Sequence, residues 1–247
     1  MAFLRRGIIP FSILAGCVLL TRPADILAED RPAGIPAEYS RLYQQTFSSD
    51  TALRDFAFPD PTAWRIVPQE SFSFLEQFRP AKYQPPVRSP VNYGLIAKQT
   101  FGNFVMDVEC QQTSREYGHR DMVFVLGYQS PSRYYYAHIA SKADDHANQI
   151  FLVNDAPRKK ISTMSNSGNN WGKDRWKTVR IRRDLQSGEI AVYFHDLSKP
   201  VMTATDRTFA AGRVGFGTFD DTCRIRSVQI WGESAKPTDP PVFHQSK

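Results

Sequence analysis

Short runs of alternating apolar and polar residues dominate the sequence, separated by segments rich in Gly, Asn, Asp, Ser and Pro. In the run FVMDVECQQ, the even-numbered residues from Phe104 to Cys110 are apolar and share one face, whereas Asp107 and Glu109 share the other. Comparable runs follow: DMVFVLGY, RYYYAHIAS, QIFLVN, KKISTM, WKTVRIRR, GEIAVYFHD, GRVGFGTF and RIRSVQIWG. No segment after the first thirty residues has the period of an amphipathic helix. Many short strands at close spacing predict an all-β sandwich or barrel.

The two ends of the chain differ from this body. A basic start, the apolar run GIIPFSILAGCVLL and a small residue at Ala28 predict a signal peptide over 1–28. Residues 29–42 are predicted to be a linker, 43–233 the folded domain and 234–247 a disordered tail. No run is long enough to predict a membrane span. We therefore expect a secreted or periplasmic protein; lipid anchoring through Cys17, in LAGC, is the alternative.

Without Cys17, two cysteines remain, Cys110 and Cys223. An exported chain can join them in one disulfide, or both can be buried thiols, and their spacing does not decide. The formal net charge is +6. An exported protein without a nucleic-acid motif is not expected to meet nucleic acid, so an acidic polysaccharide or oligosaccharide is the expected partner. A solvated basic surface is the alternative.

Three segments carry a resemblance to a known superfamily. The stretch QQTFSSDTALRDFAFPDPTAWRIVPQESFSFLEQF resembles the opening of secreted concanavalin A-like jelly rolls. The stretch VRSPVNYGLIAKQTFGNFVMDVECQQTS is similar to their next strand pair, and GRVGFGTFDDTCRIRSVQIWGE to their closing pair. Within that superfamily the chain is most similar to secreted bacterial 3-keto-disaccharide hydrolases and family-16-like glycosidase domains.

This resemblance implies a jelly-roll β-sandwich of two antiparallel sheets, and a glycoside hydrolase-like activity on a disaccharide or polysaccharide. The acidic signature strand of the family-16 glycosidases is missing. Its nearest counterpart is the pair Asp107 and Glu109, whose spacing along a strand suits two carboxylates flanking a glycosidic bond. Glu109 is therefore a candidate catalytic residue, and an ordinary solvated acidic pair is the alternative.

The strand RYYYAHIAS has two unlike faces. Tyr135, Ala137 and Ile139 suit a core, while the other face carries Tyr134, Tyr136 and His138. In a jelly roll the concave sheet binds glycan, with aromatic rings against sugar and polar tips on hydroxyls. We predict Tyr136 and His138 as catalytic and Tyr134 as substrate-binding; cross-strand packing is the alternative.

Histidine and arginine residues elsewhere suggest a second chemistry. His119 and Arg120 precede a strand, and Arg180 and Arg182 share one strand face. Were these to converge on His138, the site would suit a polysaccharide lyase, in which arginine neutralises a uronate carboxylate and His or Tyr moves the C5 proton. His119 is thus a further catalytic candidate, and the three arginines are predicted to bind substrate.

The loop SKADDHAN offers oxygen and imidazole ligands at Asp144, Asp145, His146 and Asn148, but it also suits an ordinary turn, which we favour. His146 is predicted to rim the substrate site. Trp171 is predicted as a sugar platform and Trp176 as core. No cofactor is required and no metal ligands are assigned; a structural Ca²⁺ at Asp220 and Asp221 is the alternative to a plain turn there.

Taken together, the sequence predicts an exported protein that acts on or binds a carbohydrate, with a glycoside hydrolase-like activity favoured. A polysaccharide lyase and a non-catalytic glycan-binding module remain open alternatives. Neither the glycan nor the oligomeric state follows from the sequence.

Overall fold

The computed structural model describes residue 1 and residues 31–243. The chain divides into two compact units, 1–33 and 34–247, and the β-structure belongs to the second. The predicted signal segment after residue 1, with Cys17, lies outside the described residues. In the part of the chain that the structure describes, no helix has the length and apolarity needed to cross a membrane.

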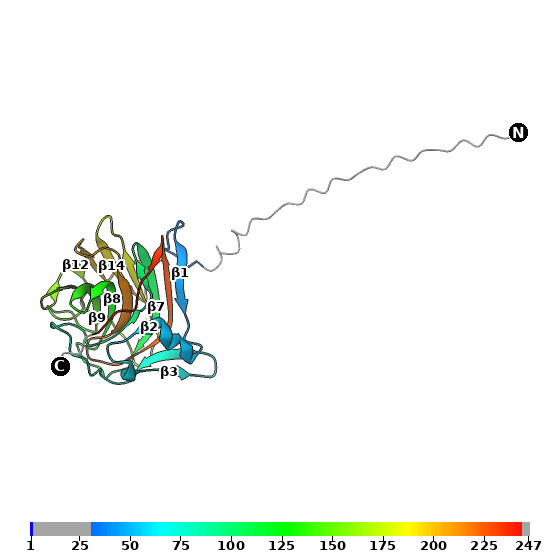
Figure 1. Cartoon of the computed structure of the whole chain (residues 1–247). Helices are drawn as coiled ribbons and strands as arrows, with labels where there is room; N and C mark the ends of the chain where they lie inside the picture. Colours follow the sequence, from blue (N-terminus) through cyan, green and yellow to red (C-terminus); the bar gives the residue numbers. More distant parts are fainter. Residues whose placement is uncertain (2–30, 244–247) are drawn as a thin grey trace. The chain divides into compact units, whose positions relative to one another are not determined.

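Two antiparallel sheets form the second unit (Figure 1). The larger sheet has nine strands, with β1 beside β17 and the other eight in the order β12-β15-β14-β13-β7-β17-β4-β3. Their bounds are β1 Ser40–Gln45, β3 Trp64–Pro68, β4 Ser73–Gln77, β7 Phe104–Gln112, β12 Ser162–Ser165, β13 Lys177–Arg183, β14 Glu189–Phe194, β15 Met202–Thr205 and β17 Cys223–Gly232.

The second sheet has seven strands in the order β11-β10-β9-β8-β16-β5-β2. Their bounds are β2 Phe56–Ala57, β5 Asn92–Ile96, β8 Asp121–Ser130, β9 Arg133–Ala140, β10 Gln149–Asn154, β11 Lys159–Lys160 and β16 Arg213–Thr218. A small ladder joins β6 (Gln99–Phe101) to β18 (Ala235–Pro237), and two short 3-10 helices, Asp50–Asp55 and Pro61–Ala63, lie between the first strands.

Alternating residues of both sheets meet in one core, as the strand period predicts. Met106 and Val108 of β7 and Val179 and Ile181 of β13 pack with Ile139 of β9. Each of these side chains is fully buried. The all-β prediction and the two-sheet sandwich are confirmed, and so is the inward face of the RYYYAHIAS strand.

The outer face of the seven-stranded sheet is also buried. A second apolar cluster there contains Tyr134 and Tyr136 of β9 and their neighbours on β5, β8 and β10. It is covered by side chains that follow β4 or β16 or lie near the C-terminus: Ala81, Tyr83, Val87, Phe219 and Phe243. This sheet is therefore packed on both faces, which alternation along a strand does not predict.

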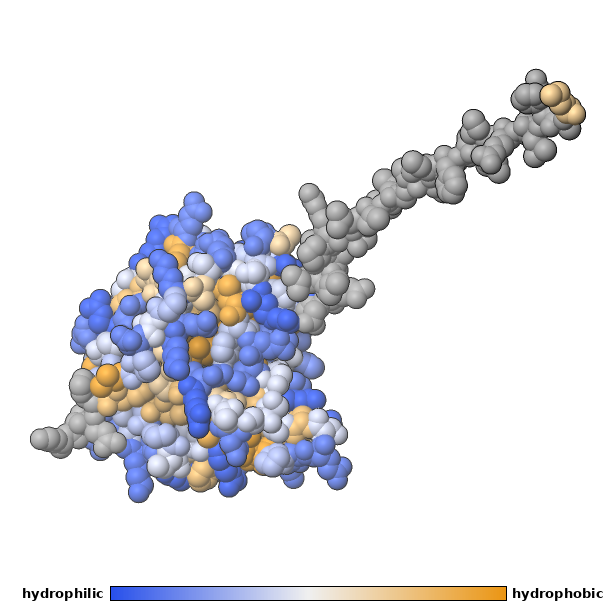
Figure 2. Space-filling model, turned by 45° about the vertical axis from the view of Figure 1, so that its right-hand side comes forward, coloured by the Kyte–Doolittle hydropathy of each residue, from blue (hydrophilic) through white to orange (hydrophobic). Residues whose placement is uncertain are grey.

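Three details refine the predicted organisation. Strand β1 starts at Ser40, slightly before the expected domain start, and β18 lies within the segment expected to be a disordered tail. Cys110 and Cys223 are both buried and free, so the thiol alternative describes them. Burial raises the pKa of the Cys110 thiol, which keeps it protonated and unreactive. The surface in Figure 2 is mainly hydrophilic, with small hydrophobic patches between polar residues.

Candidate functional site

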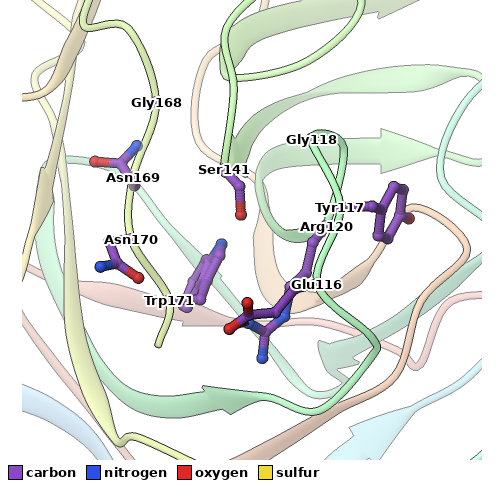
Figure 3. Close-up of a pocket in the computed structure, with 9 residues that line it drawn as sticks. All are labelled: Glu116, Tyr117, Gly118, Arg120, Ser141, Gly168, Asn169, Asn170 and Trp171. Carbon is purple, nitrogen blue, oxygen red and sulfur yellow. Dashed lines mark ion pairs between the residues drawn. The ribbon is translucent and has the colours of Figure 1, made fainter. Parts of the chain in front are cut away.

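Three loops meet at one end of the sandwich and line an open cavity of about 530 Å³. They are the β7–β8 loop, the turn after β9 and the loop from β12 to β13. The residues lining this hollow, which we call the loop-end cavity, are Glu116, Tyr117, Gly118, Arg120, Ser141, Gly168, Asn169, Asn170 and Trp171 (Figure 3). Two of the predicted substrate-binding residues, Arg120 and Trp171, are thus brought together.

A buried amide fixes the loop that carries Trp171. The side chain of Asn148, at the start of β10, donates to Asn166 Oδ1 over 2.7 Å and accepts from Asn169 Nδ2 over 2.7 Å. Asn148 has a φ of 55°, a left-handed conformation that Asn tolerates better than most residues. Gly168 then passes so close to the preceding turn that an added Cβ would lie 2.2 Å from the Ser141 carbonyl oxygen. The hydrogen bonds of Asn148 and the close approach of Gly168 to Ser141 therefore fix this loop at the wall of the cavity.

Trp171 belongs to the core and to the cavity at once. Its side chain is only 1% exposed, and its ring packs edge-on against Phe194 at a centroid distance of 4.8 Å. The indole Nε1 has no hydrogen-bond acceptor among the described residues. In Figure 3 the indole faces the same hollow as the Ser141 side chain. A buried, unpaired donor is costly, so an acceptor from a ligand or water would stabilise it.

Charge is distributed unevenly around the cavity. Arg120 is buried, and its guanidinium bonds both the side chain and the carbonyl oxygen of Gln112, while Nη1 lies 3.7 Å from Glu116. An adjoining hollow of about 270 Å³ shares Glu116 and Arg120. Its other charged residues are Arg115, Lys173 and Asp174. Three cations and two carboxylates therefore line the two hollows, so their lining carries a small excess of positive charge.

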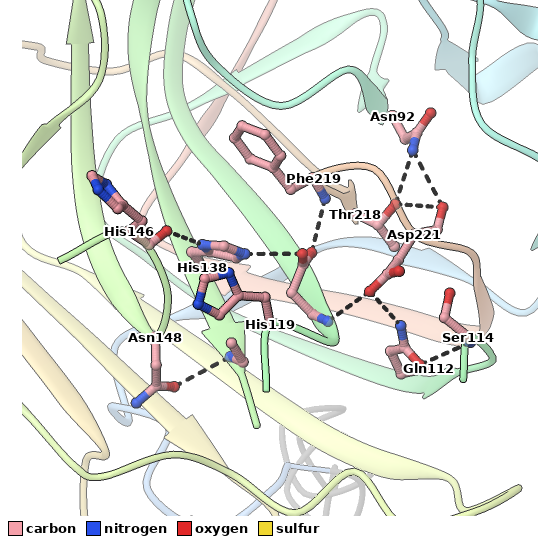
Figure 4. Close-up of polar contacts among 12 residues, drawn as sticks. Asn92, Gln112, Ser114, His119, His138, His146, Asn148, Thr218, Phe219 and Asp221 are labelled. Atoms are coloured by element: carbon pink, nitrogen blue, oxygen red, sulfur yellow. Dashed lines mark hydrogen bonds and ion pairs between the residues drawn. The ribbon is translucent and has the colours of Figure 1, made fainter. Parts of the chain in front are cut away.

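The predicted catalytic histidines make contacts within the fold (Figure 4). His138 is 3% exposed; Nδ1 donates to the His146 carbonyl oxygen over 3.0 Å, and Nε2 lies 3.0 Å from Asp121 Oδ2. His119, between the lining residues Gly118 and Arg120, pairs with Asp144, with 2.5 Å between Nε2 and Oδ2. That pair ties the β7–β8 loop to the turn after β9.

The other predicted residues of β9 are placed where a glycan would not reach them. Tyr134 and Tyr136 point to the face opposite the inter-sheet core, as predicted, but both are fully buried beneath the covering cluster. Arg158 donates to the Tyr136 hydroxyl over 2.9 Å. The packing alternative thus describes these tyrosines, and His146 is exposed but does not line the loop-end cavity.

Glu109, Arg180 and Arg182 lie on the other sheet. Arg180 forms a bidentate ion pair with Asp107, with both N–O distances 2.7 Å, and Glu109 pairs with Arg226 at 3.1 Å. Arg182 lies 3.7 Å from Glu189. These side chains occupy the outer face of the nine-stranded sheet, whereas His138 occupies the outer face of the seven-stranded one. The convergence required by a lyase is therefore not formed.

The described part of the structure groups few potential metal ligands, and the Asp221 carboxylate is already hydrogen-bonded. Among the described residues, no group of three or more His, Cys, Asp and Glu side chains is arranged to hold one. Asp221 accepts from Gln112, Tyr117 and the Asp121 backbone, at 2.9, 2.9 and 3.0 Å. Burial and the nearby Asp121 charge raise the pKa of Asp221. Calcium at this turn stays a prediction that these contacts do not favour.

Sequence reasoning missed several cavity residues. Glu116, Ser141, Asn169 and Asn170 lie in loops, where no periodic pattern marks them. The one sequence feature that could have indicated some of these residues is the polar run NSGNNWGKD, which contains Asn169 and Asn170. Trp171, predicted as a sugar platform, is buried in the core cluster and also lines the cavity. Trp176, predicted as core, is half-buried and packs against Phe72 and Phe74.

The sheet order and the two-layer core give the chain a concanavalin A-like jelly-roll fold, as the resemblance implied. The sequence matches no family model and no curated protein. Solved structures of similar fold include the following three. The carbohydrate binding module CBM66 from Bacillus subtilis is 10% identical, with a TM-score of 0.50, covering 72% of this chain and 96% of that one.

A protein of unknown function with a galectin-like fold, from Bacillus subtilis, is 10% identical, with a TM-score of 0.54 and coverage of 78% and 97%. The GH43 protein BlXynB from Bacillus licheniformis is 12% identical, with a TM-score of 0.52; 76% of this chain matches 38% of that one. At such identities the likeness shows the fold alone.

Proposed function

We propose that this protein binds an acidic carbohydrate in the loop-end cavity. The observation that carries the proposal is the buried Trp171 Nε1, a donor without an acceptor among the described residues, which lines a polar cavity beside Arg120. Ser141 Oγ and Asn170 Nδ2 also make no hydrogen bond within the described chain, so three polar groups are free for sugar hydroxyls.

The surrounding charge supports an acidic sugar. Arg115, Arg120 and Lys173 line the two joined hollows, and Lys142 lies next to Gly118 at the rim. A uronate carboxylate placed among these cations would gain attraction in a partly buried setting, where screening by salt is weaker. One solved structure of similar fold, CBM66, is a carbohydrate binding module, which agrees with this class of function.

Binding is favoured over turnover. Hydrolysis of a glycosidic bond needs two carboxylates that face the bond, and Glu116 is the one carboxylate among the residues lining the cavity. The alternative pair, Asp107 and Glu109, is on the other sheet, and each carboxylate is held by an arginine. We therefore infer a ligand-binding cavity in place of the predicted catalytic residues.

The proposal is tested with oligogalacturonates of defined length, titrated into the mature protein by calorimetry. Trp171→Phe keeps most of the ring and removes the N–H, so the dissociation constant should rise about three- to tenfold, the range for one hydrogen bond. Trp176→Phe is the matched control and should bind as the wild type does. Absence of saturable binding, or equal binding by Trp171→Phe, would refute the proposal.

A further inference from the structure

A second hollow, of about 500 Å³, lies on the outer face of the nine-stranded sheet. It arises where β17 changes partners. Strand β4 pairs with β17 as far as Ile225, and β1 begins to pair at Val228. Neither strand reaches Arg226 and Ser227, so the sheet has a notch at this point. We call this hollow the β17 notch; its lining residues are Thr46, Ser48, Gln69, Ser71, Phe72, Ser73, Glu109, Arg226, Ser227 and Gln229.

A β-bulge shapes the floor of the β17 notch. The register of β17 against β7 shifts between Ile225 and Ser227, which leaves Arg226 as the extra residue. Ser227 then pairs with Glu109, and Arg226 also reaches Glu109, with 3.1 Å between Nη1 and Oε1. Two consecutive residues of one strand therefore present their side chains to the same hollow.

Most of the uncharged polar side chains of the notch make no hydrogen bond within the described residues. Six of them make no side-chain hydrogen bond to any residue that the structure describes: Thr46, Ser48, Ser71, Ser73, Ser227 and Gln229. Five hydroxyls and one amide thus face one hollow with their donors and acceptors free. Phe72 adds an apolar ring, packed edge-on to Trp176 at a centroid distance of 6.0 Å.

The charge of the notch is balanced. Glu109 and Arg226 are its only charged lining residues, and they pair with each other. The guanidinium of Arg226 also lies 4.3 Å from the centroid of the Phe72 ring. A ligand matching this lining is uncharged and rich in hydroxyls, with an apolar face for the ring. A peptide strand fits poorly, because two unpaired residues are too short an edge for strand addition.

From this lining we infer that the β17 notch is a second carbohydrate site, which takes an uncharged sugar unit of a neutral polysaccharide. This inference stands on the notch alone and does not depend on ligand binding in the loop-end cavity. The two sites differ in charge, and they lie on different parts of the molecule's surface, so one chain would hold an acidic and a neutral glycan together.

The test uses two unbranched neutral probes, cellohexaose and xylohexaose, titrated into the mature protein by calorimetry. We expect saturable binding of at least one probe. Gln229→Ala removes the free amide and Phe72→Leu removes the ring, and each should weaken that binding about fivefold or more. Gln186→Ala, an exposed glutamine in the β13–β14 turn, and Trp171→Phe should leave it unchanged.

Three results would overturn the inference: no binding of either probe at millimolar concentration, undiminished binding by Gln229→Ala, or loss of binding in Trp171→Phe instead. The last result would place the neutral sugar in the loop-end cavity. Gln229 has no side-chain partner, so its alanine variant decides the matter even if Phe72→Leu does not fold. Loss of oligogalacturonate binding alone would count against the loop-end cavity and leave the notch intact.

Discussion

Tyr135 and its two neighbours on β9 show how much a single residue's surroundings matter. All three tyrosines are fully buried, yet Tyr135 faces the inter-sheet core and the other two face the covering cluster. The Tyr135 hydroxyl donates to Asp206 Oδ1 over 2.5 Å and accepts from the Phe209 backbone over 2.9 Å. It therefore anchors the segment between β15 and β16 to the core.

Replacing Tyr135 by Phe should lower the free energy of unfolding by about 1–3 kcal/mol at neutral pH, because a hydrogen bond to a charged group is lost. Burial acts to raise the pKa of Asp206, but hydrogen bonds from Tyr135 and Thr208 lower it below 3.8 overall. The stabilisation is thus present above about pH 4 and is lost as the pH falls and Asp206 becomes protonated. Urea unfolding at pH 7 and pH 3 checks this; an equal difference at both values would contradict it.

At the scale of elements, the loop from β12 to β13 depends on a neighbouring strand for its position. Asn148 at the start of β10 bonds this loop through Asn166 and Asn169, and its Oδ1 also accepts from the Ala140 backbone over 3.3 Å. The sequence SKADDHAN suggested a turn with metal-ligand chemistry, but here Asn148 organises the cavity. Its role could not be predicted, because the partner loop is distant in the sequence.

Asn148→Gly keeps the left-handed backbone and removes the side-chain bonds. We expect a loss of about 1–3 kcal/mol in unfolding free energy, and a weaker affinity for oligogalacturonate because Trp171 is no longer held. His195→Gly is the matched control: His195 also has a positive φ, of 64°, and its exposed side chain makes no hydrogen bond to the described residues. Thermal melts and calorimetry should show His195→Gly close to the wild type. Unchanged affinity in Asn148→Gly would show that the loop is positioned by other contacts.

At the scale of the molecule, the alternation of apolar and polar residues predicted the β-sandwich. It did not predict where the candidate binding site lies. Runs such as FVMDVECQQ specify which face of a strand meets the other sheet, and β7 and β9 obey that pattern. The same pattern predicted an open aromatic face on β9. It did not predict that this face is covered, because the covering segment 79–91 is proline-rich and has no alternating pattern. Loop residues such as Ser141 and Asn170 meet only after the chain has folded.

Binding in the loop-end cavity requires a ligand to reach Trp171. The NMR signals of the tryptophan indole N–H groups report this directly. The sequence has four tryptophans, so a ¹H–¹⁵N spectrum should show four indole resonances, with that of Trp171 assigned by its loss in Trp171→Phe. On titration with tetragalacturonate, the Trp171 indole resonance should shift saturably, while that of Trp64, buried in the core, stays in place. A Trp171 resonance that does not move at saturating ligand would contradict binding in the loop-end cavity.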